Sequence, residues 1–387
     1  MLRRLWLTFA QATTVGLALL FIVATLRPEW LREAPRSLPR AIAPALTIQP
    51  EAAGAPRAAA LGSYADAARK AMPAVVSVYT TKEMRRQPFT GDPFFERFFG
   101  GGKSLSERVT GLGSGVIATN DGYVITNNHV VEAADEIQVA LGDGRRLPAK
   151  LVGTDPESDL AVLRVEADNL PTITLGRSDA VRVGDVVLAI GNPFNVGQTV
   201  TMGIVSALGR SNLGINRYEN FVQTDAAINQ GNSGGALVDT AGNLVGINTA
   251  IFSRDGGSIG IGFAIPTVLV TDVMQQLVKT GKVVRGYFGI EPEDITQEMA
   301  QTLKLARNDG VLVRGVLRTA PAGRAGMEPL DIILAINDSE VRDTATMLNQ
   351  IAALPPGTVA KVNVLRDGKP TQLAVTVGER PAPRDQR

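Results

Sequence analysis

Residues 113–128 read GSGVIATNDGYVITNN, two short runs rich in β-branched residues that are separated by Asn, Asp and Gly. The same pattern recurs from Ala74 to about Ile265, in runs such as VVSVYT (75–80), LAVLRV (160–165), VVLAI (186–190) and TVTMGIVSAL (199–208). Short runs of this kind, bounded by turn residues, are typical of antiparallel barrels and sandwiches. This region therefore predicts a mainly β fold, and it is long enough to form two small barrels.

The composition excludes several classes of function. The 387-residue chain carries a formal net charge of +1 at pH 7, without the basic excess that is typical of nucleic-acid binding. It has no cysteine, which excludes disulfides, thiolate nucleophiles and cysteine-ligated metals. Its only histidine is His129, so a zinc site with two or three histidines cannot form within one chain. We therefore expect no nucleic-acid partner, no metal and no cofactor.

The N-terminus contains a segment that is long and apolar enough to cross a membrane. Residues 5–26 read LWLTFAQATTVGLALLFIVATL without a charge, and Arg3 and Arg4 precede them. About 20 apolar residues span the hydrocarbon core as a helix, and positive charges keep the flanking end in the cytoplasm. Residues 1–27 are therefore expected to form a cytoplasmic tip and one transmembrane helix. A cleaved signal peptide is the alternative.

Composition and periodicity divide the remainder of the chain. Residues 28–62 are rich in Pro, Ala and Arg and lack apolar periodicity, which is typical of an extended tether. A first domain is expected over residues 63–281, and its last element is predicted to be a helix over residues 266–280. Residues 282–380 hold separate strand-like runs and one amphipathic segment, which predicts a second, smaller domain. Residues 381–387 form a tail.

One serine and one histidine lie in settings that suit nucleophilic catalysis. Residues 230–235 read QGNSGG, where small residues let the backbone turn sharply and direct amide N–H groups at an acyl oxygen. Alone, this string is equally typical of an ordinary turn. His129 follows a predicted strand, from which a rigid scaffold can aim its ring. We interpret Ser233 as the nucleophile and His129 as its general base.

Asp159 is the best candidate for the acceptor that orients the imidazole. It leads directly into the apolar run LAVLRV, where a carboxylate without a partner would be costly. Asp155 and Asp135 are alternatives in more polar surroundings that water could satisfy. The chain order His129, Asp159, Ser233 is that of the chymotrypsin arrangement, whereas α/β-hydrolases use another order. A serine endopeptidase is therefore indicated, and a thioesterase or lipase is the weaker alternative.

Four motifs carry a family resemblance: TNNHV (126–130), SDLAVL (158–163), GNPF (191–194) and DAAINQGNSGGALVD (225–239). In this order and spacing they resemble the HtrA/Deg family of trypsin-like serine proteases. The resemblance extends from about Ser63 to Val377 and implies a trypsin-like double β-barrel followed by a PDZ domain. A membrane helix combined with a single PDZ domain is similar to the DegS-like branch of the family.

The resemblance implies roles for the residues around the nucleophile. The backbone N–H groups of Gly231 and Ser233 would form the oxyanion hole, with Asn232 between them. Ile228 and Ala227 would line the primary specificity pocket. Because neither is acidic, cleavage after small apolar residues is expected rather than cleavage after Lys or Arg. The residues themselves are equally consistent with Ile228 as an ordinary core position.

The resemblance also implies peptide binding and regulation. Tyr287, Phe288, Gly289 and Ile290 would form the carboxylate-binding loop of the PDZ domain, which adds an extended C-terminal peptide to a sheet edge. Arg210 would sense that peptide, and a solvated surface arginine is the alternative. The implied partners are protein substrates such as a membrane-bound anti-sigma factor, the C-termini of misfolded outer-membrane proteins, and further copies of the chain in a homotrimer. The implied location is the bacterial inner membrane, with the catalytic domain in the periplasm.

Two features depart from the family pattern. The Gly-Asp pair expected before the DIIL run is replaced by MEPLD over residues 327–331, which is expected to reshape that turn. Residues 85–108 are rich in Phe, as in the DegP and DegQ branch, and form either a disordered insertion or an apolar flap. The rival functions are a constitutive quality-control protease and a membrane-tethered PDZ adaptor or chaperone whose protease domain is inactive.

Overall fold

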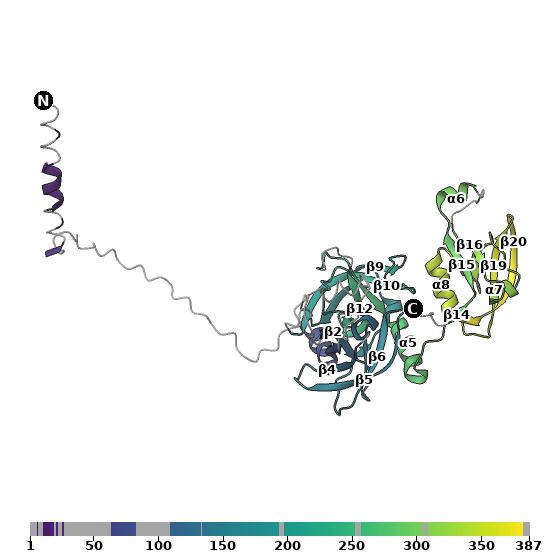
Figure 1. Cartoon of the computed structure of the whole chain (residues 1–387), viewed down its shortest axis with the longest axis horizontal. Helices are drawn as coiled ribbons and strands as arrows, with labels where there is room; N and C mark the ends of the chain where they lie inside the picture. Colours follow the sequence, from purple (N-terminus) through teal and green to yellow (C-terminus); the bar gives the residue numbers. More distant parts are fainter. Residues whose placement is uncertain are drawn as a thin grey trace. The chain divides into compact units, whose positions relative to one another are not determined.

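The chain divides into two units, Met1–Ala60 and Leu61–Arg387. The computed structural model describes residues 6, 11–18, 21, 25–26, 63–82, 109–132, 134–192, 197–251, 257–302, 305 and 309–381. The described residues of the first unit are helical (Figure 1). No described helix is both long and apolar enough to cross a membrane. The predicted membrane segment over residues 5–26 is described only in part, and the predicted tether and Phe-rich segment lie outside the described residues.

The first barrel closes from six antiparallel strands in the order β1-β2-β3-β6-β5-β4. These are β1 (Val75–Lys82), β2 (Val109–Ile117), β3 (Tyr123–Thr126), β4 (Glu136–Ala140), β5 (Arg146–Asp155) and β6 (Leu160–Val165). The turn between β2 and β3 is closed by the N–H of Gly122, which donates to the carbonyl of Thr119 at 3.1 Å. Gly122 has φ +94°, which glycine adopts without strain, so this hairpin follows directly from its sequence.

Six further strands form the second barrel, in the order β11-β8-β9-β10-β13-β12, and β12 pairs back with β11. These are β8 (Val186–Gly191), β9 (Thr199–Arg210), β10 (Phe221–Thr224), β11 (Ala236–Val238), β12 (Asn243–Ile251) and β13 (Gly262–Pro266), while β7 (Thr174–Leu175) extends the sheet beside β12. The prediction of a mainly β fold with two small barrels is therefore confirmed.

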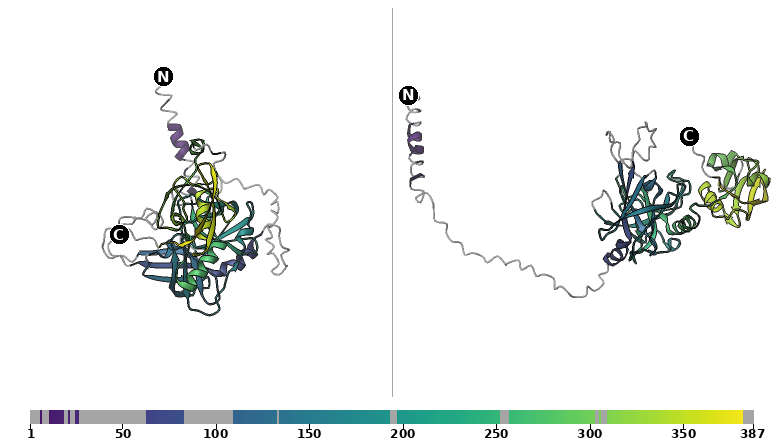
Figure 2. Two further views of the ribbon diagram at one scale, coloured as in Figure 1. Left: turned by 90° about the vertical axis from the view of Figure 1, so that its right-hand side faces the viewer. Right: turned by 60° about the horizontal axis from the view of Figure 1, so that its bottom comes forward.

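The two barrels share one apolar core. Ile125 of β3 and Leu160 of β6 belong to the same buried cluster as Leu188 of β8 and Ile247 of β12. Helix α5 (Thr267–Thr280) packs against β5, β6 and β12 and adds Leu277 to this cluster (Figure 2). Because core side chains interlock at close to crystalline density, the barrels cannot shift independently. Residues on the facing ends of both barrels are thereby held in a fixed relation.

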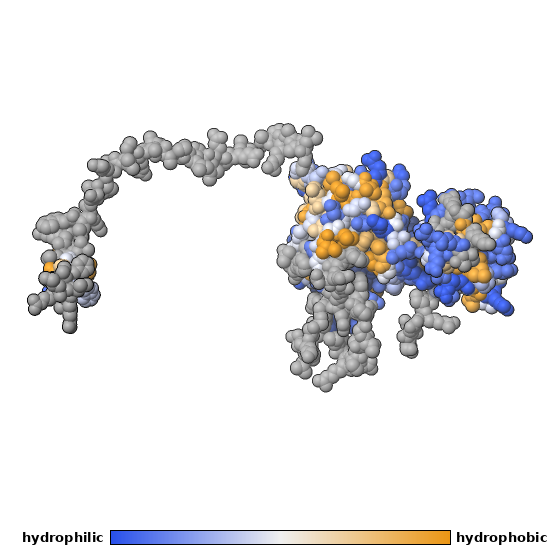
Figure 3. Space-filling view, turned by 90° about the horizontal axis from the view of Figure 1, so that it is seen from above, coloured by the Kyte–Doolittle hydropathy of each residue, from blue (hydrophilic) through white to orange (hydrophobic). Residues whose placement is uncertain are grey.

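Two shorter helices and two 3₁₀ turns complete the described residues of this part of the chain. Helix α2 (Ala65–Ala71) and the 3₁₀ turn Met72–Ala74 lead into β1, α4 (Asn128–Val131) follows β3, and a 3₁₀ turn spans Ser178–Ala180. Helix α5 ends at Gly281, whose φ of +71° is that of a left-handed cap, a conformation that glycine adopts without strain. Large apolar side chains also remain exposed, including Val183, Met202 and Ile204, and Figure 3 shows apolar areas on the surface of the barrels.

The remaining strands form the smaller domain, whose main sheet has the order β15-β16-β17-β19-β20. Its elements are β14 (Gly286–Tyr287), β15 (Ile290–Asp294), α6 (Gln297–Thr302), β16 (Val311–Val316), α7 (Pro321–Arg324), β17 (Ile332–Ile336), β18 (Ser339–Glu340), α8 (Thr344–Ala352), β19 (Val359–Arg366), β20 (Lys369–Thr376) and β21 (Gly378–Glu379). Among the described residues, β15 pairs only with β16, so its other side is a free sheet edge next to α8.

The turn before β17 keeps a glycine-type conformation without a glycine. Leu330 has φ +75°, and its N–H donates to the carbonyl of Val313 at 2.8 Å. Asp331 is 1% exposed, and both of its carboxylate oxygens accept hydrogen bonds at 2.7 Å from Arg366. The departure at residues 327–331 is therefore accommodated by placing a leucine in the left-handed region, where a side chain is strained.

We predict that Leu330→Gly stabilises the protein. The left-handed conformation costs an L-residue about 1–2 kcal/mol, while the added freedom of an unfolded glycine costs about 0.5–1 kcal/mol. Leu330 is 67% exposed, so little burial is lost. The free energy of unfolding should rise by about 0.5–1 kcal/mol in urea denaturation. Leu330→Ala, which keeps the Cβ atom, should bring no gain; a fall in stability for Leu330→Gly would contradict the strain.

Candidate active site

Asp159 immediately precedes β6, and its carboxylate is surrounded by donors. Oδ2 lies 2.7 Å from Nδ1 of His129 and accepts a hydrogen bond from the hydroxyl of Thr249 at 2.6 Å. Oδ1 accepts the backbone N–H of His129 at 2.9 Å. Asp159 has φ +57°, an uncommon conformation for a residue other than glycine, and such strain concentrates at functional sites. The hydrogen bonds hold this carboxylate in one place.

His129 lies in α4, the single helical turn that follows β3. Two bonds to the backbone carbonyl of Asp159 anchor this turn, one from the N–H of Asn128 at 3.2 Å and one from Nδ2 of Asn127 at 2.8 Å. The side chains of His129 and Asp159 are only 11% and 10% exposed. A carboxylate beside Nδ1 assigns the proton of a neutral ring to that nitrogen and leaves Nε2 as the acceptor. This is the tautomer that a general base for Ser233 requires.

Ser233 lies in the loop between β10 and β11 of the second barrel and is 5% exposed. Its hydroxyl donates to the backbone carbonyl of Thr249 at 3.1 Å. Thr249 therefore contacts two predicted catalytic residues, because its side chain bonds Asp159 and its carbonyl accepts from Ser233. Thr249 of β12 thus links Ser233 to Asp159, which in turn bonds His129.

Thr249 was not among the site residues predicted from the sequence. Its signal is the pair Asn248-Thr249, two polar residues that interrupt the apolar run after Asn243 in β12, and both are buried. The amide of Asn248 donates to the carbonyl of Ala236 at 3.0 Å, and its backbone carbonyl accepts the N–H of Gly234 at 2.8 Å. Buried polar side chains need partners, so this pair could have been recognised as part of a polar site.

The predicted oxyanion segment forms an ordered turn. The N–H of Asn232 donates to the carbonyl of Asn229 at 2.9 Å, and Gly231 has φ +97°, which together define a type II turn. Gly231, Asn232 and Ser233 are all buried. A glycine is required at the third position of such a turn, which is the physical reason for Gly231 in this string.

Ser114 of β2 braces this turn from the first barrel. It is fully buried, and its hydroxyl donates to the carbonyl of Gly231 at 2.6 Å while accepting the N–H of Asn192 at 3.0 Å. Its backbone N–H donates to the carbonyl of Ser233 at 2.8 Å. Ser114 was not predicted as a site residue, although a serine within the run GSGVIAT was a visible polar exception.

The residues predicted to line a specificity pocket differ in exposure. Ile228 is 1% exposed and packs in a buried cluster with Val187 and Leu237. This agrees with the alternative that Ile228 is a core residue, and its pocket role remains a prediction. Ala227 is half-buried, and its carbonyl accepts a hydrogen bond from the hydroxyl of Thr201 at 2.8 Å.

The two alternatives to Asp159 have other surroundings. Asp135 is exposed, whereas Asp155 is 5% exposed and forms a bidentate ion pair with Arg285, in which Nη1 lies 2.7 Å from Oδ1. The expectation that water satisfies Asp155 is therefore wrong. Burial alone would lower the pKa of Arg285, but the hydrogen bonds to the Asp155 carboxylate raise it above its ordinary value, so the guanidinium stays charged. The Arg285 guanidinium also lies 4.5 Å from the ring centre of Tyr218.

Arg210, the predicted regulatory residue, ends β9 and is exposed. Its Nε donates to the side-chain oxygen of Gln223 at 2.7 Å, within its own barrel. The loop that follows reaches the second domain through other residues. The backbone carbonyl of Glu219 accepts a hydrogen bond at 2.9 Å from Nδ2 of Asn349 in α8. Arg210 pairs across the sheet with Phe221, two residues after Glu219, and its regulatory role remains a prediction.

The predicted carboxylate-binding loop connects β14 with β15. Tyr287 ends β14, Phe288 is 2% exposed, Gly289 has φ +78°, and Ile290 begins β15. The carbonyl of Gly289 accepts the N–H of Leu317 at 2.9 Å. In the described part of the chain, no residue accepts a hydrogen bond from the N–H of Phe288 or Gly289. Two neighbouring amides of this kind suit an anion such as a peptide carboxylate.

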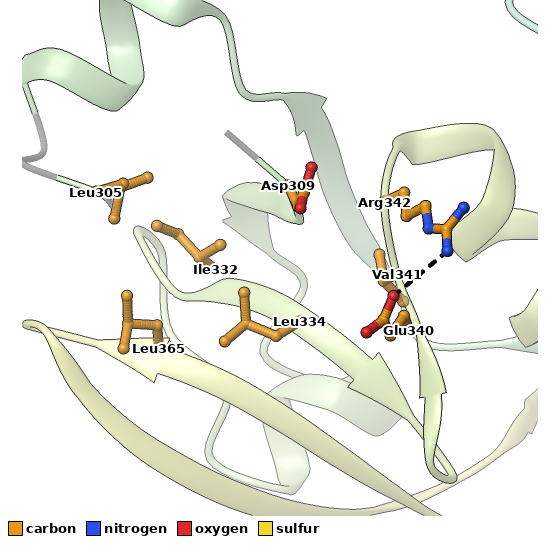
Figure 4. Close-up of a pocket in the computed structure, with 8 residues that line it drawn as sticks. All are labelled: Leu305, Asp309, Ile332, Leu334, Glu340, Val341, Arg342 and Leu365. Atoms are coloured by element: carbon orange, nitrogen blue, oxygen red, sulfur yellow. Dashed lines mark ion pairs between the residues drawn. The ribbon is translucent and has the colours of Figure 1, made fainter. Parts of the chain in front are cut away.

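A separate cavity of about 290 Å³ lies in the second domain, and Figure 4 shows its lining. Leu334 of β17 and Leu365 of β19 contribute to its apolar wall, and Arg342 pairs with Glu340 at 3.5 Å on one side. None of the predicted catalytic or peptide-binding residues lines it.

We predict that Ser114→Ala slows the reaction of Ser233 with a fluorophosphonate by about 10–100-fold, somewhat less than the effect of deleting an oxyanion donor. The variant releases the carbonyl of Gly231 and thereby loosens the turn that carries the amide donors. Ser77→Ala is the matched control, because Ser77 accepts a hydrogen bond from the Asn192 side chain at 2.7 Å but does not contact the turn. Equal rates for Ser114→Ala and the parent, measured by time-resolved labelling, would exclude a bracing role.

Comparison with known families gives two matches. Residues 113–247 match the trypsin-like peptidase domain, and residues 286–377 match the PDZ domain. The periplasmic serine endoprotease DegP of Escherichia coli is 44% identical over 359 residues, which cover 86% of this chain and 76% of that protein. A probable DegP-like periplasmic serine endoprotease of Chlamydia trachomatis is 44% identical over 315 residues. That match covers 80% of this chain and 63% of the relative, so the chain spans less than two thirds of it.

Solved structures agree with these matches. The HtrA-type protease AlgW with a decapeptide is 54% identical, with a TM-score of 0.71, and the match covers 83% of this chain and 100% of that one. AlgW with a tripeptide is 52% identical, with a TM-score of 0.72, and the match covers 84% and 99% of the two chains. The resemblance read from the sequence is thereby confirmed: the chain belongs to the HtrA family of trypsin-like serine proteases that carry a PDZ domain.

Proposed function

We propose that this chain is a serine endopeptidase that cleaves proteins by acyl transfer. His129 removes the proton from the Ser233 hydroxyl, whose oxygen attacks a peptide carbonyl, and the N–H groups of Gly231 and Ser233 stabilise the oxyanion. The protonated imidazole then donates its proton to the leaving amine. A water molecule, activated by the same imidazole, releases the acyl group from the enzyme.

The observation that carries this proposal is the arrangement around Asp159. Its carboxylate bonds both the ring and the backbone of His129, as well as the hydroxyl of Thr249, whose carbonyl accepts from Ser233. Asp159 thus orients the imidazole and stabilises the positive charge that forms on it. For attack, the Ser233 hydroxyl exchanges its bond to the Thr249 carbonyl for one to Nε2 of His129.

The substrate preference proposed here is for small apolar residues before the cleaved bond. Ile228 and Ala227 carry no charge that would attract Lys or Arg. Ile228 is part of the core, so it would shape the pocket from behind, while half-buried Ala227 lies nearer to the surface.

The PDZ domain is proposed to bind the C-termini of other proteins. The amides of Phe288 and Gly289 face no acceptor among the described residues, and the free edge of β15 beside α8 can accept an extended strand. The related AlgW structures were determined with a decapeptide and a tripeptide, which supports peptide binding in this chain.

The cellular role is proposed from family likeness. The relatives named above are periplasmic endoproteases, which supports a periplasmic location for residues 63–381. We place residues 5–26 in the inner membrane, where the chain would cut a membrane-bound anti-sigma factor or misfolded proteins once C-termini of outer-membrane proteins bind. Exposed apolar side chains such as Met202, at 60% exposure, are consistent with a homotrimer. Constitutive quality control is the second candidate role.

We predict that Ser233→Ala abolishes both fluorophosphonate labelling and casein cleavage, because no other group can supply the nucleophile. Its affinity for C-terminal peptides should equal that of the parent within about twofold, since the PDZ domain is untouched. Labelling by mass spectrometry and peptide binding by fluorescence anisotropy measure the two properties. If the Ser233→Ala variant is still labelled, Ser233 is not the nucleophile. If the parent protein is not labelled either, the alternative of an inactive PDZ adaptor is favoured.

We also predict that a free peptide carboxylate is required for binding and for activation. Amidation of the C-terminus removes the anion that the amides of Phe288 and Gly289 would hold, and should weaken binding by at least 10-fold, as expected for charge-assisted hydrogen bonds. Cleavage of a reporter peptide, followed with the free-acid and the amidated activator, tests this. If the reporter is cleaved at the same rate with the free-acid peptide, with the amidated peptide and without any peptide, the chain is a constitutive protease.

A further inference from the structure

The free edge of β15 offers backbone groups from alternate residues only. The N–H of Leu317 donates to the carbonyl of Gly289, so the backbone of Gly289 faces β16. Opposite Pro292 lies Val313, whose N–H and carbonyl bond Asp331 and Leu330 on the β17 side. The register between β15 and β16 shifts between Glu291 and Pro292, but the contacts of Gly289 and Val313 fix the backbone direction on each side of that shift. Because backbone groups alternate along a strand, those of Ile290, Pro292 and Asp294 therefore face away from β16.

Pro292 therefore occupies a position where a bound peptide would need a donor. Proline has no N–H, so the free edge presents a donor and an acceptor at Ile290 but only a carbonyl at Pro292. Proline on a sheet edge also protects against unwanted strand pairing. Here, however, the same edge borders α8 and begins directly after the loop that carries the unpaired amides of Phe288 and Gly289. The edge that proline protects is therefore also the proposed peptide site.

The register of a bound peptide follows from these positions. With the C-terminal carboxylate at Phe288 and Gly289, the last peptide residue pairs with Ile290, and the third residue from the end pairs with Pro292. The N–H of that third residue can donate to the Pro292 carbonyl. Its own carbonyl has no donor on β15, and the proline ring occupies the space where the missing hydrogen would lie.

We propose that Pro292 determines how much of a peptide this PDZ domain reads. The carboxylate and the last residue can make every backbone bond, whereas the third residue from the end makes one bond to Pro292 in place of two, and full pairing could resume only at Asp294, where β15 ends. This makes the site selective for a very short C-terminal signature that many unfolded proteins can present. The inference rests on the proposed peptide-binding function and adds to it the extent of the recognised sequence.

The test uses a six-residue apolar peptide with a free C-terminal carboxylate and an analogue of that peptide. In the analogue, an ester replaces the peptide bond between the third and the second residue from the C-terminus. An ester carbonyl is a weaker acceptor than an amide carbonyl. Both are titrated by fluorescence anisotropy into the full chain carrying Ser233→Ala, which prevents cleavage, and into the same chain with Pro292→Ala. Glu291→Gln is the matched control, because Glu291 is exposed and its backbone faces β16.

With Pro292 present, the amide and ester peptides should bind within about twofold of each other. In the Pro292→Ala protein, the restored N–H should tighten binding of the amide peptide about 5-fold, which corresponds to one net hydrogen bond of about 1 kcal/mol. The ester peptide should then bind this protein several-fold more weakly than the amide peptide does. The ester analogue also lacks the N–H of the second residue from the C-terminus. The loss of affinity from this change is the same for the proteins with and without Pro292, so it cancels in the comparison. Equal ester sensitivity with and without Pro292 would overturn the proposal while leaving peptide binding intact.

A second measurement needs no change at Pro292. Three-residue and six-residue peptides that share the same C-terminus should bind the Ser233→Ala chain within about twofold of each other. A six-residue peptide that binds more than 10-fold tighter would show extended strand pairing and would contradict the proposal. Absence of binding by every peptide would instead remove the underlying peptide-binding function.

Discussion

The carboxylate of Asp159 is buried, and a buried charge is tolerated only when hydrogen bonds surround it. Its donors come from two parts of the chain: His129 of the first barrel and Thr249 of the second. The carboxylate is satisfied only when the barrels are in their native relation, so assembly of the site and packing of the barrels are one requirement. The left-handed backbone of Asp159 adds local strain that the same hydrogen bonds offset.

Ser233, the proposed nucleophile, depends on a similar connection across the barrels. Ser114 of the first barrel bonds the carbonyls of Gly231 and Ser233 in the second, and the shared core fixes the distance between them. Four residues before Asp159, the carboxylate of Asp155 pairs with Arg285 at the entry to the PDZ domain. This ion pair joins the turn that leads to Asp159 to the first residues of the PDZ domain.

Much of this arrangement is encoded locally, and that part is readable from the sequence. The hairpin closed at Gly122 and the end of α5 at Gly281 follow from residues that are close in the chain, and so does Asp159 as a carboxylate entering an apolar strand. Thr249 and Ser114 were not foreseen because their partners lie far away: Thr249 is 90 residues from Asp159, and Ser114 is 117 residues from Gly231. Asp155 was misjudged for the same reason, since its partner Arg285 lies 130 residues away.

Because His129 is the only histidine, its imidazole can be observed directly by NMR without assignment of other rings. The account predicts that the neutral ring carries its proton on Nδ1 and that this proton gives a strongly downfield signal from its hydrogen bond to Asp159. The signal should be lost in Asp159→Asn. A ring protonated on Nε2, or an imidazole that exchanges as freely as one in solvent and does not respond to Asp159→Asn, would contradict the central claim that this carboxylate orients the base.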